Sequence, residues 1–284
     1  MKKAIGLISS LLIFMSGVGL TALAADTVTA EVAVTISDGA GALVMTQETV
    51  IATDRNNDGA VDLDEVLYAA HEQAYEGGAA AGYASATTQW GLGISKLWGD
   101  TSYNYGYYVN HKGASDLSDK VQDGDIVKAY IYQDGTTYSD EYAFFDRETI
   151  TAEAGTAITL VLKGVEFDAS WSPVDTPLAN AVITVDGEET AYQTDAQGSV
   201  TLQINSVGTH VISAKIDGKI LVPPVLTATI NEVEDEIDDT ENDAEKDETV
   251  KSPKTGDSLT PSVGMLLILG LAAVILSGKK LYEK

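Results

Sequence analysis

Two apolar segments, one near each end of the chain, limit which residues can build a folded domain. The first, Ile5–Leu20, follows two lysines and precedes the small residues Ala22-Leu23-Ala24. A charged start, an apolar core and a small-x-small site are typical of a secretory signal peptide. We therefore predict that residues 1–24 are removed before Ala25 and that the mature chain is secreted.

The second apolar segment, Val263–Leu276, contains 14 residues and is followed by Lys279 and Lys280. A transmembrane helix needs roughly 20 apolar residues, so this run depends on its flanks to stay in a bilayer. Lysines beyond it favour a cytoplasmic end. The pattern predicts transient retention of the chain in the membrane.

The pentapeptide Ser252-Pro253-Lys254-Thr255-Gly256 stands shortly before that segment. In this order, residues 252–284 resemble the cell-wall sorting signal of Gram-positive surface proteins, with Ser252 where the commonest form has leucine. The resemblance implies that a sortase cleaves between Thr255 and Gly256 and joins Thr255 covalently to peptidoglycan. The alternative is an ordinary tail anchor behind a Pro-Lys-Thr-Gly turn. We therefore expect the rest of the chain at the extracellular surface, anchored to the cell wall.

The composition is strongly acidic, with 43 Asp and Glu against 17 Lys and Arg, and it includes no cysteine. The acid excess argues against nucleic acid as a partner, because nucleic-acid phosphates require a basic face. A secreted domain without disulfides has to be stabilised by its own core or by a metal ion. Eleven of the acids fall in Glu232–Glu248, so residues 232–251 are predicted to be a self-repelling, disordered linker.

Residues 25–148 are expected to form the first domain. Apolar and polar residues alternate at period 2 from Val28 to Ile36, and strand-like segments follow at 43–45 and 49–52 after a Gly-containing turn. This pattern predicts a β-hairpin. A helix is predicted after Glu65, and it is expected to end at Gly77-Gly78.

Between the hairpin and the helix, the sequence Asp54–Glu65 resembles the twelve-residue EF-hand calcium loop. Oxygen-bearing side chains stand at loop positions 1, 3, 5, 9 and 12, and glycine stands at position 6. The resemblance implies one calcium ion held by Asp54, Asn56, Asp58, Asp62, Glu65 and the backbone carbonyl of Ala60. Because a strand precedes the loop and no second copy pairs with it, a structural role is expected. The alternative is an Asp/Asn-rich turn that caps the next helix.

An aromatic block follows the helix. Its segments 103–110, 127–132 and 138–145 are predicted to be strands, since Tyr and β-branched residues alternate there between Gly and Asp turns. Tyr107-Tyr108-Val109-Asn110 and the later Asp123–Val127 resemble the transcobalamin-type C-terminal domain of bacterial surface proteins. The resemblance covers roughly residues 28–146 and implies a β-grasp-like α+β fold with one helix.

Four aromatic residues of this block, Trp98, Tyr105, Tyr107 and Tyr108, are candidate ligand-binding residues. Alternation along a strand places Tyr105 and Tyr107 on one face and Tyr108 on the other. One face has to serve the core, so the other is expected to be exposed, and an exposed aromatic patch is typical of a binding site. The alternative is that these residues fill a β core.

Residues 149–231 are expected to form a second domain. Strand candidates recur at roughly ten-residue spacing between Gly- and Asp-containing turns, which predicts a small antiparallel β-sandwich. The turn Thr194–Gly198 and the strand after Gly208 resemble immunoglobulin-like stalk modules. The five candidates are residues 158–162, 182–185, 199–204, 210–215 and 226–230.

The predicted fold class is therefore mainly β. No catalytic constellation is recognisable, because cysteine is absent and the three histidines are scattered. We expect a non-enzymatic surface protein whose first domain binds calcium and an extracellular ligand, which is a protein, a glycan or a small molecule. The alternative function is capture of a small planar ligand such as a corrinoid.

Overall fold

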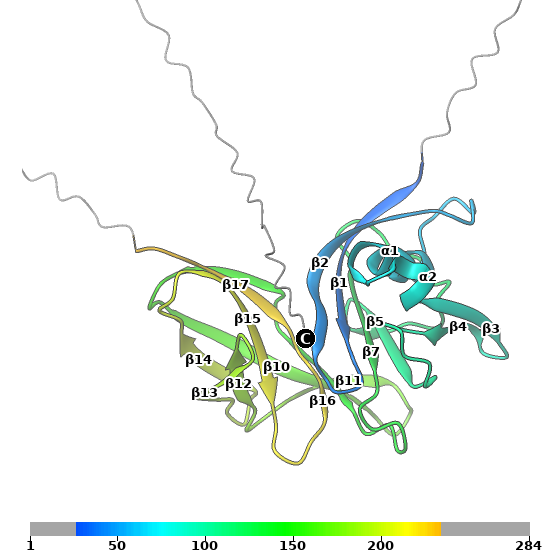
Figure 1. Ribbon diagram of the computed structural model, residues 1–284. Coiled ribbons are helices and arrows are strands. Elements are labelled where there is room, and N and C mark those ends of the chain that lie inside the picture. The colour runs from blue at the N-terminus through cyan, green and yellow to red at the C-terminus, as the bar shows by residue number, and fades with distance from the viewer. Residues whose placement is uncertain (1–26, 234–284) are drawn as a thin grey trace, which may run out of the picture. The chain divides into compact units, whose positions relative to one another are not determined.

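The computed structural model describes residues 27–233. The predicted signal peptide, nearly all of the acidic linker and the whole sorting segment lie outside that range. Within it, the fold is mainly β, as predicted (Figure 1). It contains two helices where one was expected, because a second short helix begins at Gly78, where the sequence predicted only the end of the first. No helix of the described part is long and apolar enough to cross a membrane.

The elements of the first part of the chain are two helices and seven strands. In chain order they are β1 (Thr29–Ser37), β2 (Leu43–Thr53), α1 (Leu63–Ala74), α2 (Gly78–Gly82), β3 (Ala84–Thr88), β4 (Gly91–Lys96), β5 (Tyr105–Val109), β6 (Lys112–Gly113) and β7 (Ile126–Ile131).

The elements of the remaining part are all strands. They are β8 (Glu141–Phe145), β9 (Thr149–Glu153), β10 (Ala157–Phe167), β11 (Pro173–Pro177), β12 (Val182–Val185), β13 (Glu188–Gln193), β14 (Ser199–Gln203), β15 (Gly208–Lys215), β16 (Leu221–Val222) and β17 (Leu226–Asn231).

The first sheet has the strand order β2-β1-β7-β5-β6, and β3 pairs with β4 in a separate hairpin. β1 and β2 are antiparallel neighbours, which confirms the predicted hairpin. β1 also pairs in parallel with β7. A parallel pair needs a long crossover, and the crossover here contains both helices and the calcium-like loop.

Helix α1 begins at Leu63 because the residue before it caps the helix. The Asp62 carboxylate accepts a hydrogen bond from the Glu65 N–H at 3.1 Å, and the Glu65 carboxylate accepts one from the Asp62 N–H at 3.1 Å. This reciprocal capping box satisfies two of the N–H groups that the first helical turn leaves free. The helix therefore starts inside the calcium-like loop.

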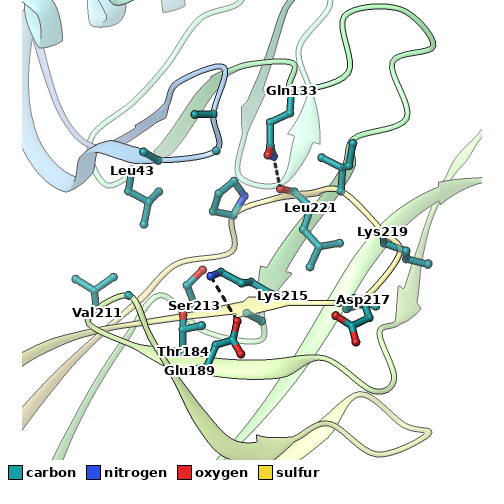
Figure 2. A pocket seen from close by; sticks show the side chains of 18 of the residues that line it. Leu43, Gln133, Thr184, Glu189, Val211, Ser213, Lys215, Asp217, Lys219 and Leu221 are labelled. Atoms are coloured by element: carbon teal, nitrogen blue, oxygen red, sulfur yellow. Dashed lines mark hydrogen bonds and ion pairs between the residues drawn. The ribbon is translucent and has the colours of Figure 1, made fainter.

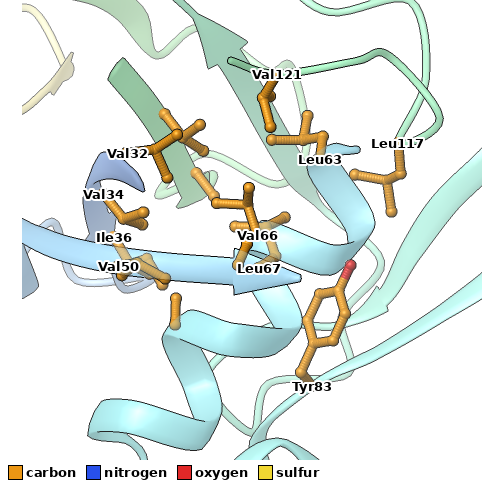
Figure 3. Packing of buried hydrophobic residues seen from close by; sticks show 14 of the residues in the cluster. Val32, Val34, Ile36, Val50, Leu63, Val66, Leu67, Tyr83, Leu117 and Val121 are labelled. Atoms are coloured by element: carbon orange, nitrogen blue, oxygen red, sulfur yellow. The ribbon is translucent and has the colours of Figure 1, made fainter. Parts of the chain in front are cut away.

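The core of the first part lies between α1 and the sheet (Figure 3). Apolar residues of β1 and β2 face the apolar side of α1, and the segment 117–121 closes one end of the cluster. Fully buried aliphatic side chains contribute about 1.5–3 kcal/mol each relative to exposure. The labelled members of the cluster are Val32, Val34, Ile36, Val50, Leu63, Val66, Leu67, Tyr83, Leu117 and Val121.

The second part of the chain contains two five-stranded sheets. One has the order β11-β10-β8-β16 with β14 also paired to β10, and the other has the order β13-β12-β15-β17-β9. All five strand candidates are confirmed as β10, β12, β14, β15 and β17. Residues from both sheets share one buried cluster, which includes Phe145, Leu160, Ile183, Ile212 and Leu226.

Three details of this part differ from a purely antiparallel, self-contained second domain. β16 pairs in parallel with β8, and β17 pairs in parallel with β9. β8 falls within the range predicted for the first domain, but it pairs with β10. The physical reason is that Phe145 and Ala143 of β8 bury their side chains in the core that the two later sheets share.

Candidate calcium loop, aromatic residues and buried junction

The first half of the calcium-like loop is closed by its own side chains. Both carboxylate oxygens of Asp54 accept hydrogen bonds, from the N–H of Asp58 at 3.2 Å and from the N–H of Gly59 at 2.8 Å. The Asn56 side-chain oxygen also accepts from the Asp58 N–H, at 2.9 Å. Gly59 has φ +93°, a left-handed conformation that glycine adopts without strain.

Glu65, the last residue of the loop, faces back toward its beginning. Its Oε1 accepts hydrogen bonds from the N–H groups of Arg55 and Asn56, the second at 3.1 Å. Asp62 lies in the same space, since the Asn56 amide nitrogen is 3.4 Å from Asp62 Oδ2. Both Asp62 and Glu65 are buried, with 3% of their surface exposed. Burial raises the pKa of Asp62 above its usual value.

A lysine from a distant segment enters the loop. Lys120 Nζ lies 2.5 Å from Asp58 Oδ2 and 3.5 Å from Asp62 Oδ2. The hydrogen bond to Lys120 lowers the pKa of Asp58, and the same bond raises the pKa of Lys120. Opposite shifts of this kind are expected when two charged forms stabilise each other.

The segment around Lys120 also pairs with the loop through its backbone. The Val121 N–H donates to the Val61 carbonyl, and the Leu63 N–H donates to the Asp119 carbonyl, both at 3.0 Å. The loop is thus paired, but with a segment of a different kind and not with a second calcium loop. The partner is a segment without calcium-loop residues, so no pattern in the sequence indicated it.

These donors fit calcium in chemical type. Calcium takes six to eight hard oxygen ligands in flexible geometry, and the loop offers four carboxylates, one amide oxygen and the Ala60 carbonyl. In the described residues, however, no three or more His, Asp or Glu side chains converge in metal-binding geometry. The carboxylates bond instead to N–H groups of the loop and to Lys120.

The aromatic residues of β5 are distributed between two faces, as alternation predicts. Tyr105 and Tyr107 pack against the first core, and the Tyr105 hydroxyl donates to the Asp100 carbonyl at 2.7 Å. Tyr108 lies on the opposite face and stacks on Tyr142, with ring centroids 3.7 Å apart and an interplanar angle of 14°. The expectation that this face is exposed was wrong, because Tyr142 of β8 covers it.

Trp98 lies apart from these tyrosines, beside helix α1. Its backbone N–H donates to His71 Nε2 at 3.0 Å, and its ring centroid is 5.2 Å from both His71 and Tyr75. His71 Nδ1 in turn donates to the Leu67 carbonyl at 2.6 Å. Burial lowers the pKa of His71, and the bond that Nε2 accepts requires an unprotonated nitrogen, so this histidine is a packed core residue.

Two exposed aromatic residues were not among the ligand-binding residues predicted from the sequence. Phe167 ends β10 and Trp171 lies in the turn that leads to β11, and they are 57% and 83% exposed. Their ring centroids lie 6.4 Å apart. Trp171 is followed by Ser172 and Pro173, a turn-like context that could have indicated an exposed position.

A buried polar cluster joins the first sheet to the later sheets. Lys128 of β7 is 6% exposed, and its ammonium donates to the carbonyls of Ala143 at 3.3 Å and Pro223 at 2.5 Å. Burial lowers the pKa of Lys128 to about 7. Tyr142 adds its ring face, whose centroid lies 5.0 Å from the ammonium.

Neighbouring side chains extend this junction. His111 Nε2 lies 2.8 Å from Glu148 Oε1, and the His111 ring stacks on Phe144 at 4.1 Å. Gln47 of β2 donates to Glu148 Oε2 at 2.7 Å and accepts from the Thr227 hydroxyl at 2.5 Å. The first sheet is thus bonded to β17 and to the loop before β9, and no linker-like segment separates the two predicted domains.

A groove of about 750 Å³ lies between the β1–β2 turn and the outer face of the sheet that contains β12 and β15 (Figure 2). Its polar walls include Gln133, which donates to the Leu221 carbonyl at 3.1 Å, and the ion pair of Lys215 with Glu189 at 3.7 Å. Its described lining includes no aromatic residue, so none of the four predicted ligand-binding residues belongs to it.

Comparisons with known proteins do not assign a family. No protein-family model matches the chain, and no curated protein is detectably similar to it. Among solved structures, the D0–D1 domain of intimin is similar over 69% of this chain and 93% of that chain, with 13% sequence identity and a TM-score of 0.22. A TM-score this low does not establish a shared fold, and no function is transferred from that structure to this chain.

Proposed function

We propose that the chain is a non-enzymatic surface protein held covalently to peptidoglycan, and that it presents a binding surface to an extracellular partner. The single observation that carries the anchoring is the order of the pentapeptide Ser252–Gly256, the apolar run and the terminal lysines. Sortase and peptidoglycan are the implied partners, with cleavage between Thr255 and Gly256.

Extraction from cells tests the anchoring. Boiling detergent should release the wild-type protein only after the peptidoglycan has been digested. Thr255→Ala should shift the protein to the detergent-extractable fraction, whereas Thr260→Ala, a threonine outside the pentapeptide, should leave it in the wall. Full-length wild-type chain recovered by detergent alone would refute the proposal.

We also propose that the loop Asp54–Glu65 binds one structural calcium ion. Asp54, Asn56, Asp58, Asp62 and Glu65 would hold it together with the Ala60 carbonyl. When bound, calcium would supply positive charge to carboxylates that otherwise bond to N–H groups of the loop and to Lys120. The proposal is supported by the direction of Glu65, which faces the loop start, and by the oxygen-only donor set.

We propose in addition a β-grasp-like fold for the first domain and an immunoglobulin-like fold for the second. A β-grasp-like first domain is supported by the five-stranded sheet with α1 packed on one face and β1 parallel to β7. An immunoglobulin-like sandwich in the second part is supported by the core that its two sheets share.

For the extracellular partner, the exposed pair Phe167 and Trp171 offers more free aromatic surface than the residues of β5. Exposed apolar patches on secreted domains commonly mark interaction sites. Capture of a planar ligand such as a corrinoid has less support, because Trp98, Tyr105 and Tyr107 pack against the first core and Tyr108 stacks on Tyr142.

A further inference from the structure

Lys120 places an ammonium group among the carboxylates of the loop Asp54–Glu65. Its contacts with Asp58, at 2.5 Å, and Asp62, at 3.5 Å, join loop positions 5 and 9. These positions belong to opposite halves of the loop. One positive charge therefore connects the two halves across the space that their oxygens share.

The backbone determines where this lysine lies. Lys120 forms an isolated antiparallel bridge with Asp62, and the flanking bonds at Val61 and Leu63 hold it in register. A surface lysine normally samples many conformations, and exposed ion pairs contribute little. Here backbone hydrogen bonds fix residue 120 beside the loop. The side chain therefore loses less conformational entropy when the ion pair forms.

Arg55, the other positively charged residue of the loop region, directs its guanidinium away from the loop carboxylates. The Arg55 guanidinium lies over the Tyr68 ring, 3.2 Å from its centroid. Arg55 approaches Glu65 through its backbone N–H alone. Among the described side chains, the ion pairs of Asp58 and Asp62 are both made by Lys120.

We propose that Lys120 is a built-in counter-ion of the calcium loop, which calcium has to displace from Asp58 and Asp62 before it binds. This inference rests on the calcium site proposed above and concerns the regulation of its affinity. A divalent cation and an ammonium group repel each other at the short distances of one loop. Each of them also needs the same carboxylate oxygens.

Two consequences follow from this competition. The loop keeps its fold without calcium, because Lys120 neutralises part of its charge. Its calcium affinity is also lowered toward the range of about 10⁻⁴–10⁻³ M that is typical of extracellular modules. A site with that affinity responds to the calcium concentration outside the cell.

The test compares Lys120→Met with Lys120→Arg and with Lys112→Met in the full-length protein. Lys112 is exposed in β6 and gives the same change in net charge away from these contacts. Isothermal titration with calcium chloride measures the Kd, and thermal unfolding in chelator measures the stability of the calcium-free loop. Lys120→Met should lower the Kd at least tenfold, equivalent to about 1.4 kcal/mol, and should lower the Tm in chelator.

The two controls should behave like the wild type, with Kd values within threefold of it. Equal calcium affinity of Lys120→Met and the wild type would overturn the role of Lys120 and leave the calcium site intact. If no variant binds calcium, even at calcium concentrations about 10-fold above the millimolar range typical of extracellular modules, both proposals are overturned together. Binding by Lys120→Met alone would support the competition strongly.

Discussion

Lys128 is a single residue with a large effect on how the stability of the protein depends on pH. Its ammonium is buried at the junction between the first sheet and the later strands, where two carbonyls accept its hydrogen bonds. Loss of solvation lowers its pKa to about 7, whereas an unfolded lysine titrates near 10.4. Between these pH values the unfolded chain holds the extra proton.

We therefore predict that the free energy of unfolding rises as the pH increases from about 7 to about 10. The unfolded state binds more protons in this window, which gives the slope its positive sign, with a maximum of about 1.4 kcal/mol per pH unit for one group. Lys128→Met should lose this rise, while Lys112→Met should keep it. Urea denaturation at several pH values measures the difference, and parallel curves for Lys128→Met and the wild type would contradict the prediction.

His71 gives a second pH dependence at the residue scale. Its Nε2 accepts from the Trp98 N–H, so it cannot take a proton without losing that bond. Because burial lowers its pKa, the unfolded chain binds the proton first when the pH falls below about 6.5. Stability should therefore decrease from pH 6.5 toward pH 5.

His71→Phe should remove most of this acid sensitivity. At pH 7 the variant should also lose about 1–3 kcal/mol, because the Trp98 N–H is left without an acceptor. Chemical denaturation at pH 5 and pH 7 measures both effects. If the stability of His71→Phe decreases between pH 6.5 and pH 5 as much as that of the wild type, other titrating groups cause the decrease.

At the scale of elements, the calcium-like loop and helix α1 form one unit, because Glu65 belongs to both. It ends the loop and completes the capping box with Asp62. Glutamine can replace glutamate in a capping box, but it lacks the charge of a bidentate calcium ligand. Glu65→Gln therefore separates the two roles of this residue.

We predict that calcium raises the Tm of the wild type and leaves that of Glu65→Gln nearly unchanged. A ligand that binds only the folded state at a hundredfold excess over its Kd adds about 2.7 kcal/mol. In chelator, the two proteins should unfold within about 1 kcal/mol of each other, because the cap is retained. Differential scanning calorimetry with calcium and with chelator measures these Tm values. An equal Tm of the wild type with calcium and with chelator would exclude a stabilising ion.

At the scale of the whole described molecule, the junction decides whether the two predicted domains unfold together. Tyr108 and Tyr142 stack across it, Lys128 bonds to two carbonyls beyond it, and Gln47 reaches Thr227. A junction with buried aromatic and polar contacts favours a single cooperative transition.

Tyr108→Ala should weaken this coupling. We expect a loss of about 1–3 kcal/mol, less than for a fully buried aromatic residue because Tyr108 is half-buried, and a separation of the unfolding curve into two transitions. Tyr103→Ala is the matched control, because Tyr103 is 72% exposed. Calorimetry distinguishes the two cases, and one undivided transition in Tyr108→Ala would show that the stack does not couple the two parts.

The sequence alone determined the features that depend on short-range signals. Alternation at period 2 predicted β1, and the recurring Gly- and Asp-containing turns predicted the five strands of the second part. The sequence also predicted a helix beside the loop, although α1 begins at Leu63 and not after Glu65. The calcium-like loop was recognisable because all its proposed ligands lie within twelve consecutive residues. Such signals act through caps, turns and side-chain direction, which each segment carries by itself.

The tertiary structure decided the features that join distant segments. Lys120 meets Asp58 across 62 positions of sequence, and Gln47 meets Thr227 across 180. β8 joins the later sheets, and its Tyr142 covers the face of β5 that alternation left free for a ligand. Periodicity states which faces are apolar but not which partner covers them, because that choice depends on shape and packing between whole elements.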